Sequence, residues 1–351
     1  MKPGIINRRR FLLFALILAT ATGEPGANTA GAREPASAKA RLRGEYGFLS
    51  CATLGAQPEK EIRARVAVMA KTFGIREFMF YDWFADYSTA IAGPNWTDPF
   101  YHRDAISRRT IEVSIDEIHR QGGRAWAYVQ AVGAEEQNLE DPNRDIWKLK
   151  NAKGEWYWHP PGAAKPRFPT YFANAAWAKH MVDRWAEPVK QLGFDGIHWD
   201  TLGKIAGDYG AETAGIHAFI RTAKKLLRDR GLRQTMNMVD LAWWDRELVR
   251  DYLEFPYAEV WSNESRQRYF DEMKQPDMIV VRGVIAMYPS VAVPPGATEA
   301  DVICNRRVDA LKHRLVPLLV GDGNRRMKHE YWPETVPLSD EVKECLRTGV
   351  D

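Results

Sequence analysis

The sequence predicts an α/β protein folded as a single (β/α)8 TIM barrel, and three observations support this prediction. Strand signals alternate with helix signals eight times along residues 41–351. The strand candidates are short and mostly apolar, which is typical of a parallel sheet buried on both faces. The length of this region suits eight strand–helix units joined by a few long loops.

The first four units are expected in the N-terminal half of the chain. Their strands are predicted at residues 45–53, 77–83, 124–133 and 196–200. Their helices are predicted at residues 59–73, 107–120, 175–192 and 213–230. Ser107 is a good N-cap for the second helix, because its hydroxyl can accept a bond from an unpaired backbone N–H. A long loop that contains Trp147, Trp156 and Trp158 precedes the third helix.

The other four units complete the barrel. Their strands are predicted at residues 234–239, 257–262, 278–288 and 316–323. Their helices are predicted at residues 245–252, 266–274 and 300–313, with a last helix that starts near residue 339. The alternative is an open, doubly wound sheet. No glycine-rich phosphate loop follows the first strand, so this alternative lacks its usual signature.

Composition and charge narrow the function classes. The chain has 351 residues, of which 45% are hydrophobic and 27% charged, as in ordinary globular proteins. The net charge of +3 is small and the basic residues are mixed with acidic ones, so the sequence lacks the basic face of a nucleic-acid-binding protein. The 13 Trp and 13 Tyr residues fit either a large core or a cleft that stacks on sugar rings.

The first 40 residues are interpreted as an export signal and leader, and residues 41–351 as the single barrel domain. Arg8, Arg9 and Arg10 precede a short apolar run and then small residues, which is the order of a secretory signal. The arginines resemble a twin-arginine signal, although Asn7 stands where Ser or Thr is usual. A periplasmic or extracellular location is therefore expected. A membrane anchor is the alternative, although the run is short for a bilayer.

The three cysteines give no sign of a disulfide framework or a metal site. Cys51, Cys304 and Cys345 are odd in number and widely spaced, which argues against such a framework. Cys51 and Cys304 lie in apolar segments and are expected to be buried thiols. No CxxC or HExxH pattern occurs, so neither a structural zinc site nor a zincin metal site is expected.

Polar residues at the predicted strand ends locate the candidate site, because barrel active sites lie at the C-terminal ends of the strands. The segment GFDGIHWDTLG, residues 193–203, carries Asp200 at the end of the fourth strand. The other polar candidates at or after strand ends are Asp82, Asn237, Glu259, Asp322 and Glu330. The aromatic residues expected to surround the mouth are Tyr81, Trp83, Tyr128, Trp199, Trp261, Tyr288 and Trp332.

Two of these carboxylates form a candidate catalytic pair. Asp200 and Glu259 end the fourth and sixth strands of the predicted barrel, which are close enough to place both carboxylates across a sugar. A pair of this kind can attack an anomeric carbon and protonate the leaving oxygen. Aromatic neighbours around Glu259 would favour its protonated form. Each acid alone could instead form a salt bridge or a cap. His198 lies two residues before Asp200, so both should face the barrel interior, where His198 is either a buried structural residue or a partner that orients Asp200.

Together these segments resemble glycoside hydrolase family 66, the dextranases and cycloisomaltooligosaccharide glucanotransferases. GFDGIHWDTLG is similar to the segment that carries the family nucleophile. The resemblance runs in order from Glu45 to Glu341 and includes EYGFLS, FGIREFMFYDW with Asn95-Trp96, RAWAYVQAVGA, TMNMV, YAEVWS and RMKHEYWPETVPLSDE.

The resemblance implies a function and a role for each matching residue. Asp200 would be the nucleophile and Glu259 the acid/base of a retaining enzyme that cleaves α-1,6-linked glucans without a cofactor. The residues that would line the sugar cleft are Asp82, Trp83, Tyr128, His198, Asn237, Trp261, His329 and Glu330. The implied partner is a polysaccharide or oligosaccharide substrate. The family's flanking β-domains are not expected here, because the leader and the end at Asp351 leave no room for them.

Alternatives remain open at this point. The protein could be a non-catalytic sugar-binding barrel of a polysaccharide locus, or an enzyme that acts on a different polysaccharide. The acid pair favours an enzyme. The family's cyclising members carry a carbohydrate-binding insertion after the seventh strand, whereas the connection here, PSVAVPPGATEAD, is too short to house a domain. Linear products are therefore expected.

Overall fold

A computed structural model describes the barrel region of the chain. The described residues are 45–55, 57–87, 89–99, 105–132, 140–150, 153–155, 172–200, 209–239, 244–259, 263–273, 284–286, 296–312, 316–320, 325–327 and 335–347. All of them belong to one compact unit, Ala38–Asp351.

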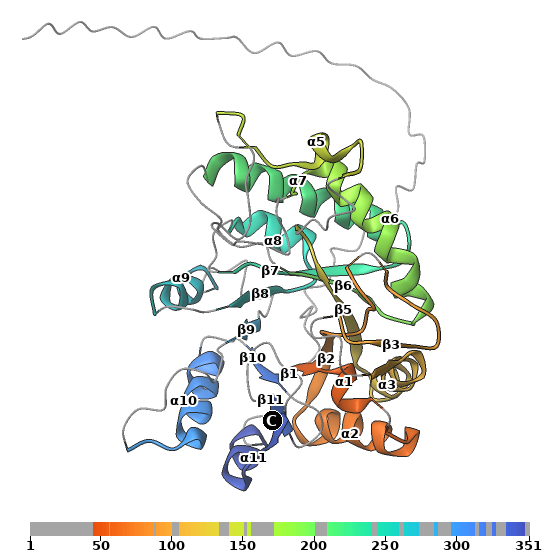
Figure 1. The fold of residues 1–351 in the computed structure, drawn as a ribbon. Coiled ribbons are helices and arrows are strands. Elements are labelled where there is room, and N and C mark those ends of the chain that lie inside the picture. Colours follow the sequence, from red (N-terminus) through yellow and green to blue (C-terminus); the bar gives the residue numbers. More distant parts are fainter. Residues whose placement is uncertain are drawn as a thin grey trace, which may run out of the picture. The chain divides into compact units, whose positions relative to one another are not determined.

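Eight parallel strands close into a barrel, as the sequence predicts (Figure 1). In spatial order the strands are β1 (Glu45–Leu49), β10 (Val316–Val320), β9 (Val284–Ala286), β8 (Pro256–Glu259), β7 (Arg233–Asn237), β6 (Gly196–Asp200), β5 (Arg124–Gln130) and β2 (Ile75–Phe80), which returns to β1. Each barrel strand pairs with its neighbours in the order of the chain, so every crossover connects adjacent strands. This is the topology of a (β/α)8 barrel.

Helices follow the strands and cover the outside of the barrel (Figure 1). Those among the described residues are α1 (Cys51–Leu54), α2 (Glu59–Thr72), α3 (Arg108–Arg120), α5 (Arg144–Trp147), α6 (Ala175–Gln191), α7 (Tyr209–Arg228), α8 (Arg246–Tyr252), α9 (Asn263–Met273), α10 (Glu299–Lys312) and α11 (Asp340–Arg347). The predicted N-cap is confirmed, because the Ser107 side chain accepts a bond from the Arg109 backbone N–H. Asn174 and Asp245 cap α6 and α8 in the same way.

The structure differs from the sequence prediction mainly in the loops. The first strand ends at Leu49 rather than residue 53, because Ser50 caps the short helix α1. Two antiparallel hairpins were not predicted: β3 (Asn95–Thr97) with β4 (Ala105–Ser107), and β11 (Arg325–Met327) with β12 (Thr335–Pro337). Three-residue strands are too short to show a clear alternation of polar and apolar residues.

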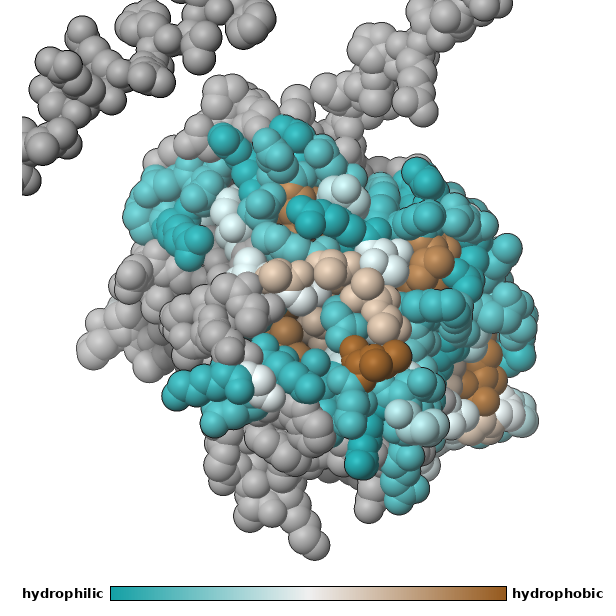
Figure 2. Space-filling view, turned by 90° about the horizontal axis from the view of Figure 1, so that it is seen from above, coloured by the Kyte–Doolittle hydropathy of each residue, from teal (hydrophilic) through white to brown (hydrophobic). Residues whose placement is uncertain are grey.

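Most described tryptophans belong to the core. Trp83, Trp126, Trp177, Trp185 and Trp199 have at most 1% of their surface exposed. On the face drawn in Figure 2, hydrophobic residues form small separate groups among hydrophilic ones. In the described part of the chain, no helix is both long and apolar enough to cross a bilayer.

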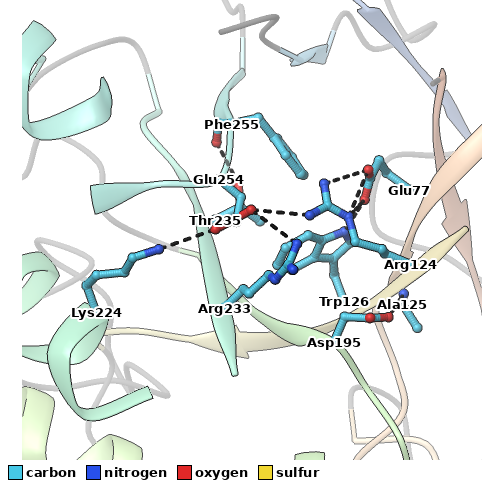
Figure 3. A network of polar contacts seen from close by, with 10 residues as sticks. All are labelled: Glu77, Arg124, Ala125, Trp126, Asp195, Lys224, Arg233, Thr235, Glu254 and Phe255. Atoms are coloured by element: carbon cyan, nitrogen blue, oxygen red, sulfur yellow. Dashed lines mark hydrogen bonds and ion pairs between the residues drawn. The ribbon is translucent and has the colours of Figure 1, made fainter. Parts of the chain in front are cut away.

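A buried ion pair lies at the N-terminal end of the barrel (Figure 3). Glu77 and Arg124 are direct partners in the register of β2 and β5, and their side chains are 0% and 2% exposed. The Arg124 guanidinium donates to both Glu77 oxygens, at 2.7 to 3.1 Å. The Trp126 indole N–H donates to the same carboxylate at 2.7 Å. These four donated bonds help to offset the desolvation of the buried charges.

Glu254, just before β8, extends this network across the barrel. Its carboxylate accepts bonds from Arg124 at 3.2 Å and from Lys224 at 3.3 Å, and lies 3.5 Å from Arg233. Burial alone would raise the pKa of Glu254, but these three positive charges lower it below its ordinary value. Charged side chains therefore form ion pairs with one another at the N-terminal end of the barrel. Residues at this end of a (β/α)8 barrel contribute to the stability of the fold.

One cysteine prediction is wrong and another is confirmed. Cys304 on α10 forms a disulfide with Cys345 on α11, whereas the sequence indicated a buried thiol at Cys304. The Cα atoms lie 5.8 Å apart because α10 and α11 pack side by side (Figure 1), a proximity that a separation of 41 residues does not reveal. Cys51 is buried and forms no disulfide, as predicted.

Reduction of this disulfide is expected to destabilise the protein. Opening a loop of this length increases the entropy of the unfolded chain, which corresponds to about 3–4 kcal/mol in the free energy of unfolding. Urea unfolding of oxidised and reduced protein would measure the difference, and a Cys304→Ser, Cys345→Ser variant should match the reduced protein. Equal unfolding midpoints for the oxidised and reduced forms would contradict a stabilising role.

Candidate active site

Strand β6 carries the candidate nucleophile, and its sequence explains how the residue is positioned. Alternation turns Gly196, His198 and Asp200 toward the barrel interior. Gly196 is required by close packing, because a Cβ there would lie 2.3 Å from the Arg233 carbonyl oxygen and 2.7 Å from the Trp126 ring. The side chain of Asp195, just before the strand, accepts bonds from the Ala125 N–H and from His119. These contacts fix the N-terminal end of β6, and Asp200 lies at the C-terminal end of the same strand.

Among the described residues, Tyr128 and Asn237 each donate to one carboxylate oxygen of Asp200. The Tyr128 hydroxyl donates to Oδ2 at 2.7 Å, and the Asn237 Nδ2 donates to Oδ1 at 2.6 Å. Tyr128 comes from β5 and Asn237 from β7, the two strands that flank β6. The two bonds fix the plane of the carboxylate and stabilise its negative charge.

The orientation of Asn237 is itself fixed. Its Oδ1 accepts a bond from the Val239 backbone N–H at 3.0 Å, so its Nδ2 must face Asp200. Val239 has a φ of 21°, which is an outlier for a β-branched residue. The Asn237 side chain thus links the backbone at Val239 to the Asp200 carboxylate. Backbone strain of this kind is often found at functional sites.

Tyr128 is suited to remain a donor. Burial, and next the charge of Asp200, raise the pKa of Tyr128 well above its ordinary value. Its ring packs against Tyr81 with centroids 4.6 Å apart and stacks near His198 at 6.4 Å. The sequence placed Tyr128 in the sugar cleft. In the structure only 5% of its surface is exposed and its hydroxyl binds Asp200.

His198 is a buried residue beneath the site. It is 1% exposed, its Nδ1 lies 3.4 Å from the Tyr46 hydroxyl, and its ring packs against Tyr257. Burial lowers the pKa of His198 to about 4 despite the nearby charge of Asp200, so the ring is neutral at pH 7. Among the described residues, Tyr128 and Asn237 orient Asp200. The burial of His198 therefore favours the structural alternative, and a contact between His198 and sugar stays a prediction.

The neutral state of His198 predicts acid lability. Its pKa is lower in the folded protein than in the unfolded chain, so the unfolded state binds the proton more tightly. The free energy of unfolding should fall as the pH drops from 6.5 to 4, by about 3 kcal/mol from this residue. His198→Gln should show a flatter pH dependence in urea unfolding over this range. Parallel curves for variant and wild type would contradict the prediction.

The side chains of Asp82 and Trp83 form hydrogen bonds with other parts of the protein in this structure. Both Asp82 oxygens accept bonds at the start of α1: Oδ1 from Cys51 N at 2.6 Å, and Oδ2 from Ala52 N at 2.9 Å and from the Ser50 hydroxyl at 2.8 Å. Burial raises the pKa of Asp82, although these bonds oppose the shift. Trp83 is fully buried, so its ring offers no face to a sugar, and its indole N–H donates to the Tyr128 carbonyl.

The predicted aromatic rim is also corrected at Trp199. This residue alternates with His198 and Asp200, so its side chain points away from the barrel interior. Its ring packs against Phe219 of α7 with centroids 5.2 Å apart, and its indole N–H donates to Gln234. Sequence reasoning also missed Tyr46 and Tyr257, whose rings support His198 from β1 and β8.

Several predicted site residues lie outside the described part of the chain. Trp261, Tyr288, Asp322, His329, Glu330 and Trp332 are among them. Glu259 is the last residue of β8, two strands from β6 around the barrel, and its side chain is also outside the description. Among the described residues, no group of three His, Cys, Asp or Glu side chains is placed to hold a metal ion.

Two curated relatives match part of this chain. Two cycloisomaltooligosaccharide glucanotransferases from Niallia circulans are 26% and 24% identical to this chain over 247 and 238 residues. Each match covers 62% of this chain and 24% of the relative, so the chain matches about a quarter of the length of these proteins.

Solved structures show the same barrel. A cycloisomaltooligosaccharide glucanotransferase from Paenibacillus sp., complexed with cycloisomaltoheptaose, is 25% identical with a TM-score of 0.57, covering 71% of this chain and 39% of that one. An α-amylase from Geobacillus thermoleovorans, complexed with acarbose, shares the fold at 10% identity with a TM-score of 0.56, covering 88% and 78%.

The family comparison covers the whole described region. The model of glycosyl hydrolase family 66 matches residues 43–347, from just before β1 to the end of α11. This range includes Asp200 with its two donors, and the resemblance seen in the sequence is confirmed. The chain therefore belongs to glycosyl hydrolase family 66.

Proposed function

We propose that this protein is a retaining glycoside hydrolase that cleaves α-1,6-glucosidic bonds within linear glucans. The observation that carries the proposal is the Asp200 carboxylate, held by Tyr128 and Asn237 at the C-terminal end of β6. A nucleophilic carboxylate must be correctly oriented before it attacks, and these two donors hold Asp200 in one orientation. Membership of a glycosyl hydrolase family supports the same chemistry.

The proposed reaction has two steps. An Asp200 oxygen attacks the anomeric carbon while Glu259 gives its proton to the glycosidic oxygen, and the bond between that oxygen and the anomeric carbon breaks. Glu259 then takes a proton from water, and the water oxygen attacks the anomeric carbon and releases Asp200. The Tyr128 and Asn237 donors stabilise the carboxylate as it leaves in the second step.

The choice of substrate rests on the relatives. The similar proteins are named as cycloisomaltooligosaccharide glucanotransferases, and one is complexed with cycloisomaltoheptaose. We propose linear products for this chain, because the connection between β9 and α10, residues 287–298, is too short to house a domain that could hold the free end of a glucan. Without that restraint, ring closure costs more entropy and water becomes the favoured acceptor.

A panel of α- and β-glucans tests the proposal. Purified protein should release reducing ends from dextran, chromatography should show linear oligosaccharides, and proton NMR should show retained configuration in the first product. Cyclic major products would contradict the hydrolytic assignment, and inverted configuration would contradict the mechanism. Release from another glucan alone would reassign the substrate. Sugar binding without any release would identify a non-catalytic barrel.

We also propose that the protein is exported through the twin-arginine route. The signal-like order around Arg8 and Arg9 supports this, and so does the disulfide Cys304–Cys345, because disulfides persist in oxidising compartments. Replacing Arg8 and Arg9 with Lys should retain the protein inside the cell, as measured by fractionation. Unchanged export would point to the general secretory route instead.

A further inference from the structure

The strand next to Asp200 carries a polar side chain that the mechanism above does not use. Alternation on β5 turns Arg124, Trp126, Tyr128 and Gln130 to one face. The first two bind Glu77 and the third binds Asp200, so this face is the barrel interior. Gln130, the last residue of the strand, is therefore expected to face the mouth of the barrel.

The register places Gln130 beside the nucleophile. Its Cα is the direct partner of the Asp200 Cα in the pairing of β5 with β6. Neighbouring strands lie about 4.8 Å apart, which is within the reach of a glutamine side chain. A sugar ring whose anomeric carbon contacts Asp200 would also lie against the Gln130 carboxamide.

The Gln130 side-chain oxygen has no hydrogen-bond partner in the described part of the chain. This atom, Oε1, is buried. A buried carbonyl oxygen without a donor destabilises the folded state, and such atoms are rare in native proteins. The neighbouring carboxylate contrasts with it, because each Asp200 oxygen accepts a bond from its own donor.

We propose that the Gln130 carboxamide binds a hydroxyl group of the sugar unit that Asp200 attacks. A sugar hydroxyl can donate to Oε1, and the amide can also donate to a hydroxyl oxygen. The inference rests on the proposed function and adds a residue that selects and positions the substrate. The buried Oε1 atom gains a hydrogen bond only when sugar is present. The destabilising effect of the unpaired oxygen in the sugar-free protein is therefore removed on binding.

Gln130→Met tests the inference, because methionine has a similar volume and cannot replace the amide bonds. We expect kcat/KM on isomaltooligosaccharides to fall about 10- to 100-fold, while Tm stays the same or rises. The matched control is Gln191→Met at the exposed end of α6, which should leave kcat/KM unchanged. A full kcat/KM in Gln130→Met would overturn the inference, and a clear loss of Tm would assign Gln130 a structural role instead.

Deoxygenated substrates identify the hydroxyl. Aryl α-glucosides that lack one hydroxyl each should lose activity with the wild type at the contacted position. Gln130→Met should lose nothing further at that position, because the same bond is already absent. Losses that multiply at every position would mean that Gln130 contacts none of these hydroxyls.

A binding measurement separates this inference from the proposed function. Calorimetry with isomaltooligosaccharides on Asp200→Asn, with and without Gln130→Met, does not depend on turnover. Weaker binding in the double variant supports the Gln130 contact even if the wild type hydrolyses no glucan. Hydrolysis by the wild type together with equal affinities and equal kcat/KM values would refute the Gln130 contact alone.

Discussion

Asp200→Asn is expected to reduce hydrolysis of α-1,6-glucans by several orders of magnitude while the protein stays folded. The amide removes the attacking negative charge. It can still accept from Asn237, and the Tyr128 hydroxyl can turn to accept from the new N–H, so the local hydrogen bonds survive. Reducing-end assays would measure kcat/KM, and thermal unfolding would confirm the fold.

Asp195→Asn is the matched control, because it makes the same chemical change five residues earlier on the same segment. Asp195 binds the Ala125 N–H and His119 at the opposite end of β6. We expect a modest loss of Tm and an unchanged kcat/KM. An Asp200→Asn variant that keeps most of the wild-type rate would remove Asp200 from the role of nucleophile.

Glu259→Gln should separate the two proposed carboxylate roles. Substrates with good leaving groups need little protonation, so their first step should be less affected than cleavage of natural glucans. Equal losses on activated and natural substrates would count against an acid/base role for Glu259.

Arg124→Met is expected to destabilise the folded protein by about 3–5 kcal/mol. The substitution leaves the Glu77 carboxylate buried, with the Trp126 N–H as its remaining donor in the network of Figure 3. It also removes one of the positive charges around Glu254. Urea unfolding measures the change.

Two comparisons make this prediction specific. The double variant Arg124→Met, Glu77→Gln should recover part of the loss, because it removes the unpaired charge. Arg65→Met breaks an exposed pair with Glu61 on α2 and should cost less than about 1 kcal/mol. If Arg124→Met were no more destabilising than Arg65→Met, the buried network would not be a major source of stability.

The barrel and the position of Asp200 could be predicted from the sequence because their signals are local. The strand of residues 196–200 was predicted with the bounds that the structure shows. Alternation also predicted that His198 and Asp200 share a face. The same rule turns Trp199 outward, so its assignment to the mouth was an avoidable error.

The short hairpins and the contacts made by residues between strands and helices were harder to predict. The β3–β4 pair joins three-residue segments, and the role of Asp82 depends on a neighbouring loop that begins about 30 residues earlier. A carboxylate that follows a strand looks the same in sequence whether it binds a sugar or caps a helix. The role of the carboxylate depends on which backbone N–H groups lie within hydrogen-bond distance of it.

The sequence by itself determined the fold class, the family and a carboxylate at the end of the fourth barrel strand, because the period of apolar residues and a continuous motif are properties of neighbouring residues. Only the tertiary structure decided what each polar group binds. Closure of the barrel brings Tyr128 and Asn237 to opposite oxygens of Asp200, Arg124 to Glu77, and Cys304 to Cys345. These partners lie 37 to 72 residues apart in the sequence. They meet because burial of the strands and helices fixes where each side chain points.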